Sequence, residues 1–333
     1  MAKADKPKDS ASDAAAPPKE GEKLQKVLAR TGLGSRREME RWIEQGRITI
    51  DGKLASLGDR VGAEQRIEVD GRPLAAGDGE KTRCMLYHKP TGEVCSRKDP
   101  EGRRTVFERL PKVKSGRWIS IGRLDYNTSG LLLFTTDGEL ANALMHPSAN
   151  IEREYMVRVM GDVTEEAIKA MLEGVMLDDG VARFTDIQSG GGDGINTWYY
   201  VVLMEGRNRE VRRLWESQGL TVSRLKRVRY GDLLVPSKVK QGQYQELATN
   251  EINGLYRMAG MPTKDVAPPS REDRSKHKRM EGKRGRVRGN KSPVDDFGSR
   301  DARKDARKDR PTKGRKSGSK SSSAPKNKRR TRA

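Results

Sequence analysis

The alternation of hydrophobic and polar positions separates a globular middle from two polar ends. Large apolar residues are absent from the twenty positions after Met1 and are sparse beyond about residue 260. Such segments cannot bury enough apolar surface to offset the entropy lost on ordering, so we expect both ends to be disordered. The predicted division is a tail at 1–21, a small domain at 22–75, a linker at 76–81, a larger domain at 82–257 and a second tail at 258–333.

The small domain is predicted to contain two helices and a small sheet. Ser35 and Glu38 have the spacing of a capping box, so we expect a helix to begin there. Gly46 supplies a left-handed end to that helix, and Asp51-Gly52 is a tight hairpin signal. The strands expected in this domain are residues 48–50, 67–69 and 72–74.

The larger domain alternates strand-like and helix-like runs. We expect strands at 84–88, 118–121, 131–136, 154–159, 197–204 and 221–230, and helices at 139–145, 165–172 and 208–217. Strands outnumber helices, and many of the connections are short. These features predict an α+β domain with a mainly antiparallel sheet flanked by helices.

Charge indicates the class of partner. The 68 Lys and Arg against 47 Asp and Glu give a formal charge of +21, and residues 262–333 carry +17 of it. A large polyanion is the natural partner for this charge, although basic composition alone does not separate nucleic acid from an acidic protein or a membrane surface.

Other classes are disfavoured by what the sequence lacks. No apolar run approaches the roughly 18 residues that a membrane span needs, and the N-terminal segment has no signal-peptide core. Cys84 and Cys95 do not have the spacing of metal ligands, either with each other or with the three histidines. We therefore expect a cytoplasmic protein with no membrane association and no metal.

The small domain carries a concentration of positive charge. Seven basic residues fall within 25 positions, where a solvated helix face would normally mix signs, and this predicts a phosphate-binding surface. With the capping box and the Asp-Gly hairpin, the segment resembles the S4 RNA-binding domain. The resemblance implies RNA contacts from Lys26, Arg36, Arg37 and Arg41.

The most concentrated polar cluster, residues 122–130, lies between two expected strands. It could be a plain turn in which Asp125 or Asn127 caps its own backbone. Alternatively, a loop held between buried strands is a rigid mount for a functional carboxylate. The arginine-rich segments 153–159 and 206–215 favour the second interpretation, because nearby positive charge lowers the pKa of a carboxyl group and keeps it ionised for nucleophilic attack.

These segments resemble the RsuA/RluB group of pseudouridine synthases. The resemblance rests on Gly122-Arg123-Leu124-Asp125 with Thr128-Ser129-Gly130-Leu131-Leu132, on Thr136-Asp137-Gly138, on Lys89-Pro90-Thr91-Gly92 and on residues 154–159 and 206–213. With the S4-like segment it spans about residues 22–257, in the order of the family.

The resemblance implies a role for individual residues. Asp125 matches the nucleophile, Tyr155 the residue that stacks on the base and assists removal of the carbon 5 proton, and Arg212 the basic partner of the aspartate. Further substrate contacts are expected from Val211, Arg123, Arg207 and Asn208. The implied activity is isomerisation of a uridine of ribosomal RNA to pseudouridine, by a monomer without a cofactor. The implied RNA is 23S rRNA, because the long basic tail favours the members of the group that act on the large subunit.

Two alternatives remain open at this point. One is the same chemistry on small-subunit rRNA or another RNA hairpin. The other is a non-catalytic RNA-binding protein of ribosome assembly that uses only the S4-like segment and the tail.

Overall fold

A computed structural model describes residues 21–74, 81–113, 116–264 and 266. Most of the two expected tails and of the linker lies outside these residues. No helix within the described ranges is both long enough and apolar enough to cross a membrane.

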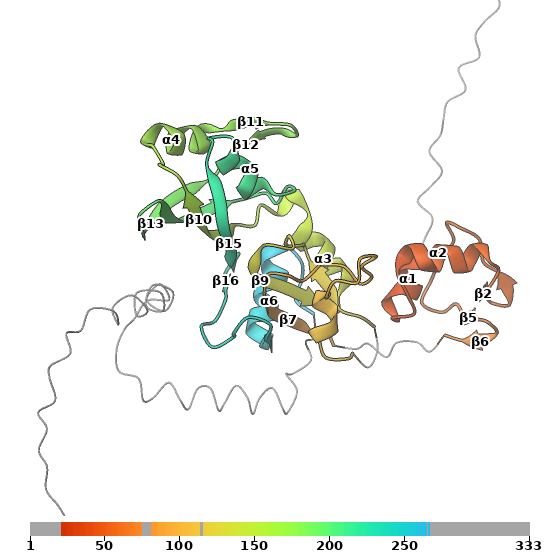
Figure 1. Cartoon of the computed structure of the whole chain (residues 1–333). Helices are drawn as coiled ribbons and strands as arrows, with labels where there is room; N and C mark the ends of the chain where they lie inside the picture. The colour runs from red at the N-terminus through yellow and green to blue at the C-terminus, as the bar shows by residue number, and fades with distance from the viewer. Residues whose placement is uncertain (1–20, 75–80, 114–115, 265, 267–333) are drawn as a thin grey trace, which may run out of the picture. The chain divides into compact units, whose positions relative to one another are not determined.

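The small domain has the predicted pair of helices and a four-stranded antiparallel sheet in the order β3-β2-β5-β6 (Figure 1). Ser35 Oγ accepts from the Glu38 backbone N–H at 3.1 Å, and the Glu38 carboxylate accepts from the Ser35 N–H at 3.3 Å, which confirms the capping box. Asp51 and Gly52 both have positive φ, as a tight hairpin turn requires. The helices are α1 (Leu24–Arg30) and α2 (Arg36–Glu44), and the strands are β1 (Glu22–Lys23), β2 (Ile48–Ile50), β3 (Lys53–Leu54), β4 (Arg60–Val61), β5 (Ile67–Val69) and β6 (Arg72–Pro73).

The larger domain is built on a nine-stranded sheet whose main path runs β13-β14-β10-β15-β9-β7-β17. Its described strands pair antiparallel except β15 with β9, which meet in parallel through Lys226 opposite Ser129 and Arg227 opposite Gly130. The strands are β7 (Cys84–Lys89), β8 (Ile119–Ile121), β9 (Ser129–Thr135), β10 (Arg153–Met160), β13 (Asp186–Asp193), β14 (Asn196–Leu203), β15 (Thr221–Tyr230), β16 (Leu233–Leu234) and β17 (Tyr244–Glu246). The α+β class and the mainly antiparallel sheet are thus confirmed.

Alternate side chains of the sheet enter two separate cores. On β9, Leu132 and Phe134 join one core with α4 and α5, whereas Leu131 and Leu133 join the other with α3 and α6. Figure 1 shows α4, α5 and the hairpin β11–β12 at the end of the sheet that holds β10 and β13. The remaining elements are α3 (Gly138–Met145), α4 (Glu165–Glu173), α5 (Glu210–Glu216), α6 (Thr249–Met258), β11 (Val175–Leu177), β12 (Gly180–Ala182) and two 3₁₀ turns, Val106–Arg109 and Pro147–Ala149.

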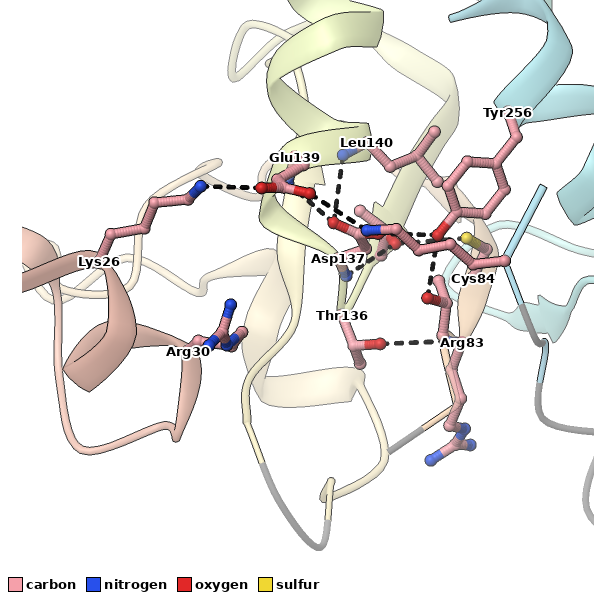
Figure 2. A network of polar contacts seen from close by, with 12 residues as sticks. Lys26, Arg30, Arg83, Cys84, Thr136, Asp137, Glu139, Leu140 and Tyr256 are labelled. Atoms are coloured by element: carbon pink, nitrogen blue, oxygen red, sulfur yellow. Dashed lines mark hydrogen bonds and ion pairs between the residues drawn. The ribbon is translucent and has the colours of Figure 1, made fainter. Parts of the chain in front are cut away.

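A polar network joins α6, which the sequence pattern did not predict, to the start of α3. The Asp137 carboxylate caps α3 by accepting from the backbone N–H groups of Glu139 at 2.8 Å and Leu140 at 3.2 Å. It also accepts from the Tyr256 hydroxyl of α6 at 2.7 Å, as Figure 2 shows. Glu139 in turn pairs with Lys26 at 2.8 Å. Asp137 therefore fixes two helices on the same face of the sheet.

Candidate active site

The polar cluster singled out in the sequence forms a tightly held loop, which we call the Asp125 loop (residues 122–128). It connects β8 to β9 and ends where β9 meets β15. Gly130, two residues into β9, has a φ of +111°, and a Cβ atom there would overlap the backbone of Arg227. Only glycine allows the two strands this close approach, so the loop is anchored at the junction of the sheet.

Lys89, at the end of β7, lies beneath the loop and is fully buried. Its Nζ donates to the carbonyl oxygens of Asp125 at 3.0 Å and Thr128 at 2.9 Å, and to that of Pro90 at 3.0 Å. Burial lowers the pKa of this amine below its usual 10.5. The lysine of the Lys-Pro-Thr-Gly motif thus braces the loop from inside the protein.

Every carbonyl oxygen from Leu124 to Thr128 accepts a hydrogen bond. Lys89 contacts the carbonyls of Asp125, Tyr126 and Thr128. In addition, the Leu124 carbonyl accepts from Cys95 Sγ at 3.3 Å, that of Tyr126 from the Gly92 N–H at 2.9 Å, and that of Asn127 from Arg212 at 3.1 Å. Five consecutive peptide groups with partners leave little freedom to the backbone. The half-buried Asp125 side chain is therefore presented from a rigid support.

The loop forms one wall of a cleft of about 840 Å³. Tyr155, on β10, and Val211, on α5, line it with only 8% and 4% of their surface exposed. Six of the seven catalytic and substrate-contact residues expected from the sequence line this cleft: Arg123, Asp125, Tyr155, Arg207, Asn208 and Val211. The structure therefore gathers residues from three distant stretches of the chain around Asp125.

Arg212, the seventh, does not line the cleft but lies behind the Asp125 loop. It is buried, and its guanidinium donates to the carbonyl oxygens of Asn127 at 3.1 Å and Val222 at 2.9 Å. Burial lowers the pKa of the Arg212 guanidinium below its usual range, while the charge of Asp125 acts in the opposite direction and favours the cationic form. Arg212 thus supplies positive charge close to Asp125 and holds the loop, without an ion pair to that carboxylate within 4 Å in the described residues.

The arginines near the start of α5 have different roles. Arg207 lines the cleft, but its guanidinium donates to the carbonyls of Gly180 at 3.2 Å and Val181 at 2.6 Å and pairs with Glu205 at 2.6 Å. Arg213 pairs with Asp179 at 2.8 Å. Both fasten the hairpin β11–β12 against α5. Arg123 and Asn208, in contrast, are exposed at the cleft.

Arg153, Arg227 and Tyr230 also line the cleft, although the sequence interpretation gave them no individual role. Arg227 on β15 is 3% exposed, donates from Nε to the Leu131 carbonyl at 2.8 Å, and lies 5.3 Å from the Tyr230 ring centroid. Arg153 lies at the same distance from that ring. The sequence of β15 reads Arg224-Leu225-Lys226-Arg227-Val228-Arg229. Two irregularities in its pairing with β10 break the period of two, so counting positions does not show which cation faces inward.

In the small domain, three of the four expected RNA contacts lie on the surface. Arg36, Arg37 and Arg41 of α2 are exposed and have no acidic partner within the described ranges. Lys26 of α1 is engaged, because it pairs with Glu22 at 2.7 Å and Glu139 at 2.8 Å. The exposed face of α2 thus carries unpaired positive charge suited to phosphates.

Comparison with known families identifies the class. Residues 83–217 match the profile of the RNA pseudouridylate synthase family, and residues 22–67 match that of the S4 domain. The chain belongs to the RNA pseudouridylate synthase family and is an isomerase, which confirms the resemblance drawn from its motifs.

The most similar relatives share one name. A Pseudomonas aeruginosa protein named ribosomal large subunit pseudouridine synthase B is 57% identical over 261 residues, which are 78% of this chain and 67% of the relative. A protein of the same name from Vibrio cholerae is 54% identical over 271 residues, 80% of this chain and 84% of the relative. A crystal structure described as a pseudouridylate synthase has a TM-score of 0.49 and 28% identity, and covers 70% of this chain and 99% of that one.

Proposed function

We propose that this protein converts a uridine of large-subunit ribosomal RNA to pseudouridine, with Asp125 as the nucleophile. The observation that carries the proposal is the Asp125 loop itself. A carboxylate carried by five hydrogen-bonded peptide groups, in a cleft that is also lined by a buried tyrosine and several arginines, is equipped for covalent attack. The choice of large-subunit rRNA is supported by the name that the similar relatives share.

The proposed reaction begins with extrusion of the target nucleotide into the cleft, at a cost of a few kcal/mol that phosphate contacts and stacking offset. Arg123, exposed beside Asp125, holds the extruded nucleotide and takes its place in the RNA stack. Tyr155 stacks on the uracil, and Val211 bounds the base on its apolar side.

Asp125 then attacks either carbon 6 of the ring or the anomeric carbon of the ribose. The bond between ring nitrogen 1 and the anomeric carbon breaks, the uracil turns, and carbon 5 bonds to the sugar. The bond between the Asp125 carboxylate and the substrate breaks in the same course, which returns the free carboxylate. Carbon 5 loses a proton, with Tyr155 placed to assist, and nitrogen 1 gains one. The substrate and product are isomers, so atoms and electrons balance without an external donor.

The decisive experiment compares Asp125→Asn with the wild type on transcripts of large-subunit and small-subunit rRNA. We expect the variant to make no pseudouridine on the large-subunit transcript and to retain nearly wild-type RNA affinity. Asp162→Asn, a matched change at an exposed position outside the cleft, should leave both unchanged. Product formation by Asp125→Asn would refute the proposed nucleophile.

The RNA class is tested separately in cells. Mapping pseudouridines in rRNA with and without the gene should reveal one or more large-subunit positions that depend on it. If only pseudouridines of small-subunit rRNA depended on the gene, the protein would act on small-subunit rRNA and not on large-subunit rRNA. An absence of any dependent position, together with intact RNA binding, would favour the non-catalytic assembly protein.

A further inference from the structure

The sheet face opposite the cleft carries a separate group of side chains. On β10, Tyr155 and Val157 face the core that surrounds the cleft, so the alternate residue Arg158 lies on the other face. We define the outer face by Arg158 of β10, Trp198 and Tyr200 of β14, and Arg224 of β15. None of these four residues belongs to an apolar core of the described structure.

Strand pairing places three of these residues in one row. Trp198 lies opposite Arg158, and Arg158 lies opposite Arg224. The Arg158 guanidinium lies 6.0 Å from the Trp198 ring centroid, and its Nε donates to Ser223 Oγ at 2.9 Å. The row therefore combines an aromatic ring with two adjacent cations.

The two arginines form a like-charge pair that the fold does not neutralise. Neither Arg158 nor Arg224 has an acidic partner within 4 Å among the residues that the structure describes, although other cations of the same sheet, such as Arg229, are paired. Like charges directly opposite each other on neighbouring strands destabilise a sheet. A bound polyanion would relieve this repulsion.

The next row extends the same surface. Tyr200 lies between Gln188 of β13 and Met156 of β10. At Gly190 of β13, a Cβ atom would lie 3.1 Å from Tyr200 Cε2 and 3.4 Å from Trp198 Cβ. A side chain there would crowd both aromatic residues, so the glycine leaves them room on the edge of the sheet.

The helices on this side of the sheet lie elsewhere. The core on the outer side is formed by α3 and α6 against β7 and β9, with Tyr230 at the end of β15. The helices that accompany β10 and β14, α4 and α5, contribute instead to the core that includes Tyr155 and Val211 of the cleft. The outer face of β14, β10 and β15 is thus separate from both helical layers.

We propose that this outer face binds RNA at a second place, remote from the cleft and distinct from α2 of the small domain. The arginine pair would contact consecutive phosphates, and Trp198 and Tyr200 would stack on unpaired bases, as aromatic residues on other RNA-binding sheets do. An acidic protein would satisfy the arginines but not use the aromatic rings, so RNA is the occupant that the whole row fits. The proposal rests on RNA as the substrate of the cleft.

The test uses the full chain and two RNAs, a short hairpin containing the target uridine and a long rRNA fragment that surrounds it. Arg224→Glu should weaken binding of the long fragment about tenfold and reduce the slope of log Kd against log salt by about 1. Trp198→Ala should weaken binding of the long fragment about fivefold with little change of slope. Both should keep the wild-type kcat/KM on the short hairpin. Lys169→Glu, the same charge change at an exposed position of α4 on the cleft side, is the control and should leave all values unchanged.

A second measurement separates a binding role from a structural one. Arg224→Glu should raise the Tm of the free protein by about 1–3 °C, because the new carboxylate faces Arg158 across the strands. Wild-type affinity and salt slope for the long fragment in both variants would overturn the proposal, and so would a loss of affinity that merely follows a loss of Tm. A wild-type protein that binds the long fragment but makes no pseudouridine on either RNA would instead refute the proposed function.

Discussion

The Nζ of Lys89 donates a hydrogen bond to the backbone carbonyl of Asp125 at 3.0 Å, which connects the end of β7 to the residue proposed as nucleophile. This contact gives the Lys-Pro-Thr-Gly motif a physical purpose. The motif holds the Asp125 loop through main-chain carbonyls and does not enter the cleft itself. Precise placement of a nucleophile is worth several orders of magnitude in rate, so the brace matters for catalysis.

Replacing the brace should affect both stability and rate. Lys89→Met keeps the length of the side chain but removes this donor from four backbone carbonyls, those of Pro90, Asp125, Tyr126 and Thr128. We expect unfolding to become easier by about 2–4 kcal/mol and kcat to fall at least about tenfold, with KM changed less. Urea unfolding and single-turnover assays measure the two effects. Lys169→Met on α4 is the control, and a Lys89→Met variant with wild-type kcat would show that the loop holds its geometry without the lysine.

The junction between β9 and β15 makes a stricter prediction. Gly130→Ala adds one methyl group where the Arg227 backbone leaves no room, and it also demands a φ that an L-residue rarely adopts. We expect a destabilisation of about 3 kcal/mol or more and loss of product formation at temperatures where the fold survives. Gly219→Ala, at a glycine that also has positive φ but open space around it, separates the backbone cost from the steric one. Equal effects of the two substitutions would contradict the close-approach argument.

The Asp137 network predicts an acid-sensitive contribution to stability. Burial alone would raise the pKa of this carboxyl, but hydrogen bonds from Tyr256, Lys264 and two backbone amides outweigh it and lower the pKa below 3.8. Because the pKa of Asp137 is lower in the folded than in the unfolded protein, the ionised carboxylate contributes fully to the free energy of unfolding above the unfolded pKa near 3.9. This contribution is lost as the pH falls through the lower pKa of the folded protein.

We therefore expect Asp137→Asn to destabilise the protein by about 1–3 kcal/mol from pH 5 to 7, and the gap to the wild type to narrow below about pH 4. Chemical denaturation across this range measures the gap. Asp162→Asn should show no such gap. If the difference in unfolding free energy between Asp137→Asn and the wild type stayed constant down to pH 3, the destabilisation would come from packing and not from loss of the ionised carboxylate.

Two of the arginines that line the cleft, Arg207 and Arg123, should respond to substitution in opposite ways. Arg207→Ala removes the contacts that fasten the hairpin β11–β12, so the Tm should fall by several degrees while KM changes little at temperatures where the variant is folded. Arg123→Ala removes an exposed side chain, so the Tm should hold while KM for RNA rises about tenfold. Thermal melts and steady-state kinetics on one RNA distinguish them. A large rise in KM for Arg207→Ala without a change in Tm would restore Arg207 as a substrate contact.

Much of this fold could be predicted from local sequence. The capping box at Ser35 and the hairpin at Asp51-Gly52 depend on interactions within a few residues, and the strand 221–230 is marked by a local run of strand-forming residues. Each appears where it was expected. The cluster around Asp125 was recognisable because it combines several polar types between two apolar strands.

The rest depends on contacts between distant segments. Helix α6 has a partly polar sequence and is held by Tyr256 against Asp137, 119 residues away. Lys89 and Arg227 are buried only because the sheet brings β7 and β15 to the Asp125 loop, and two irregularities in β15 conceal which of its cations faces inward. No local pattern carries that information.

The parallel contact between β9 and β15 also sets a sequence of events during synthesis. Strands β7, β8 and β9 leave the ribosome early, but β15 ends at Tyr230 and β17, the antiparallel neighbour of β7, ends only at Glu246. The Asp125 loop therefore acquires its full support only when about a hundred further residues have emerged beyond it. A nascent chain halted before this point would present the carboxylate without its rigid mount, so competence for catalysis requires the chain to extend through β15 and β17.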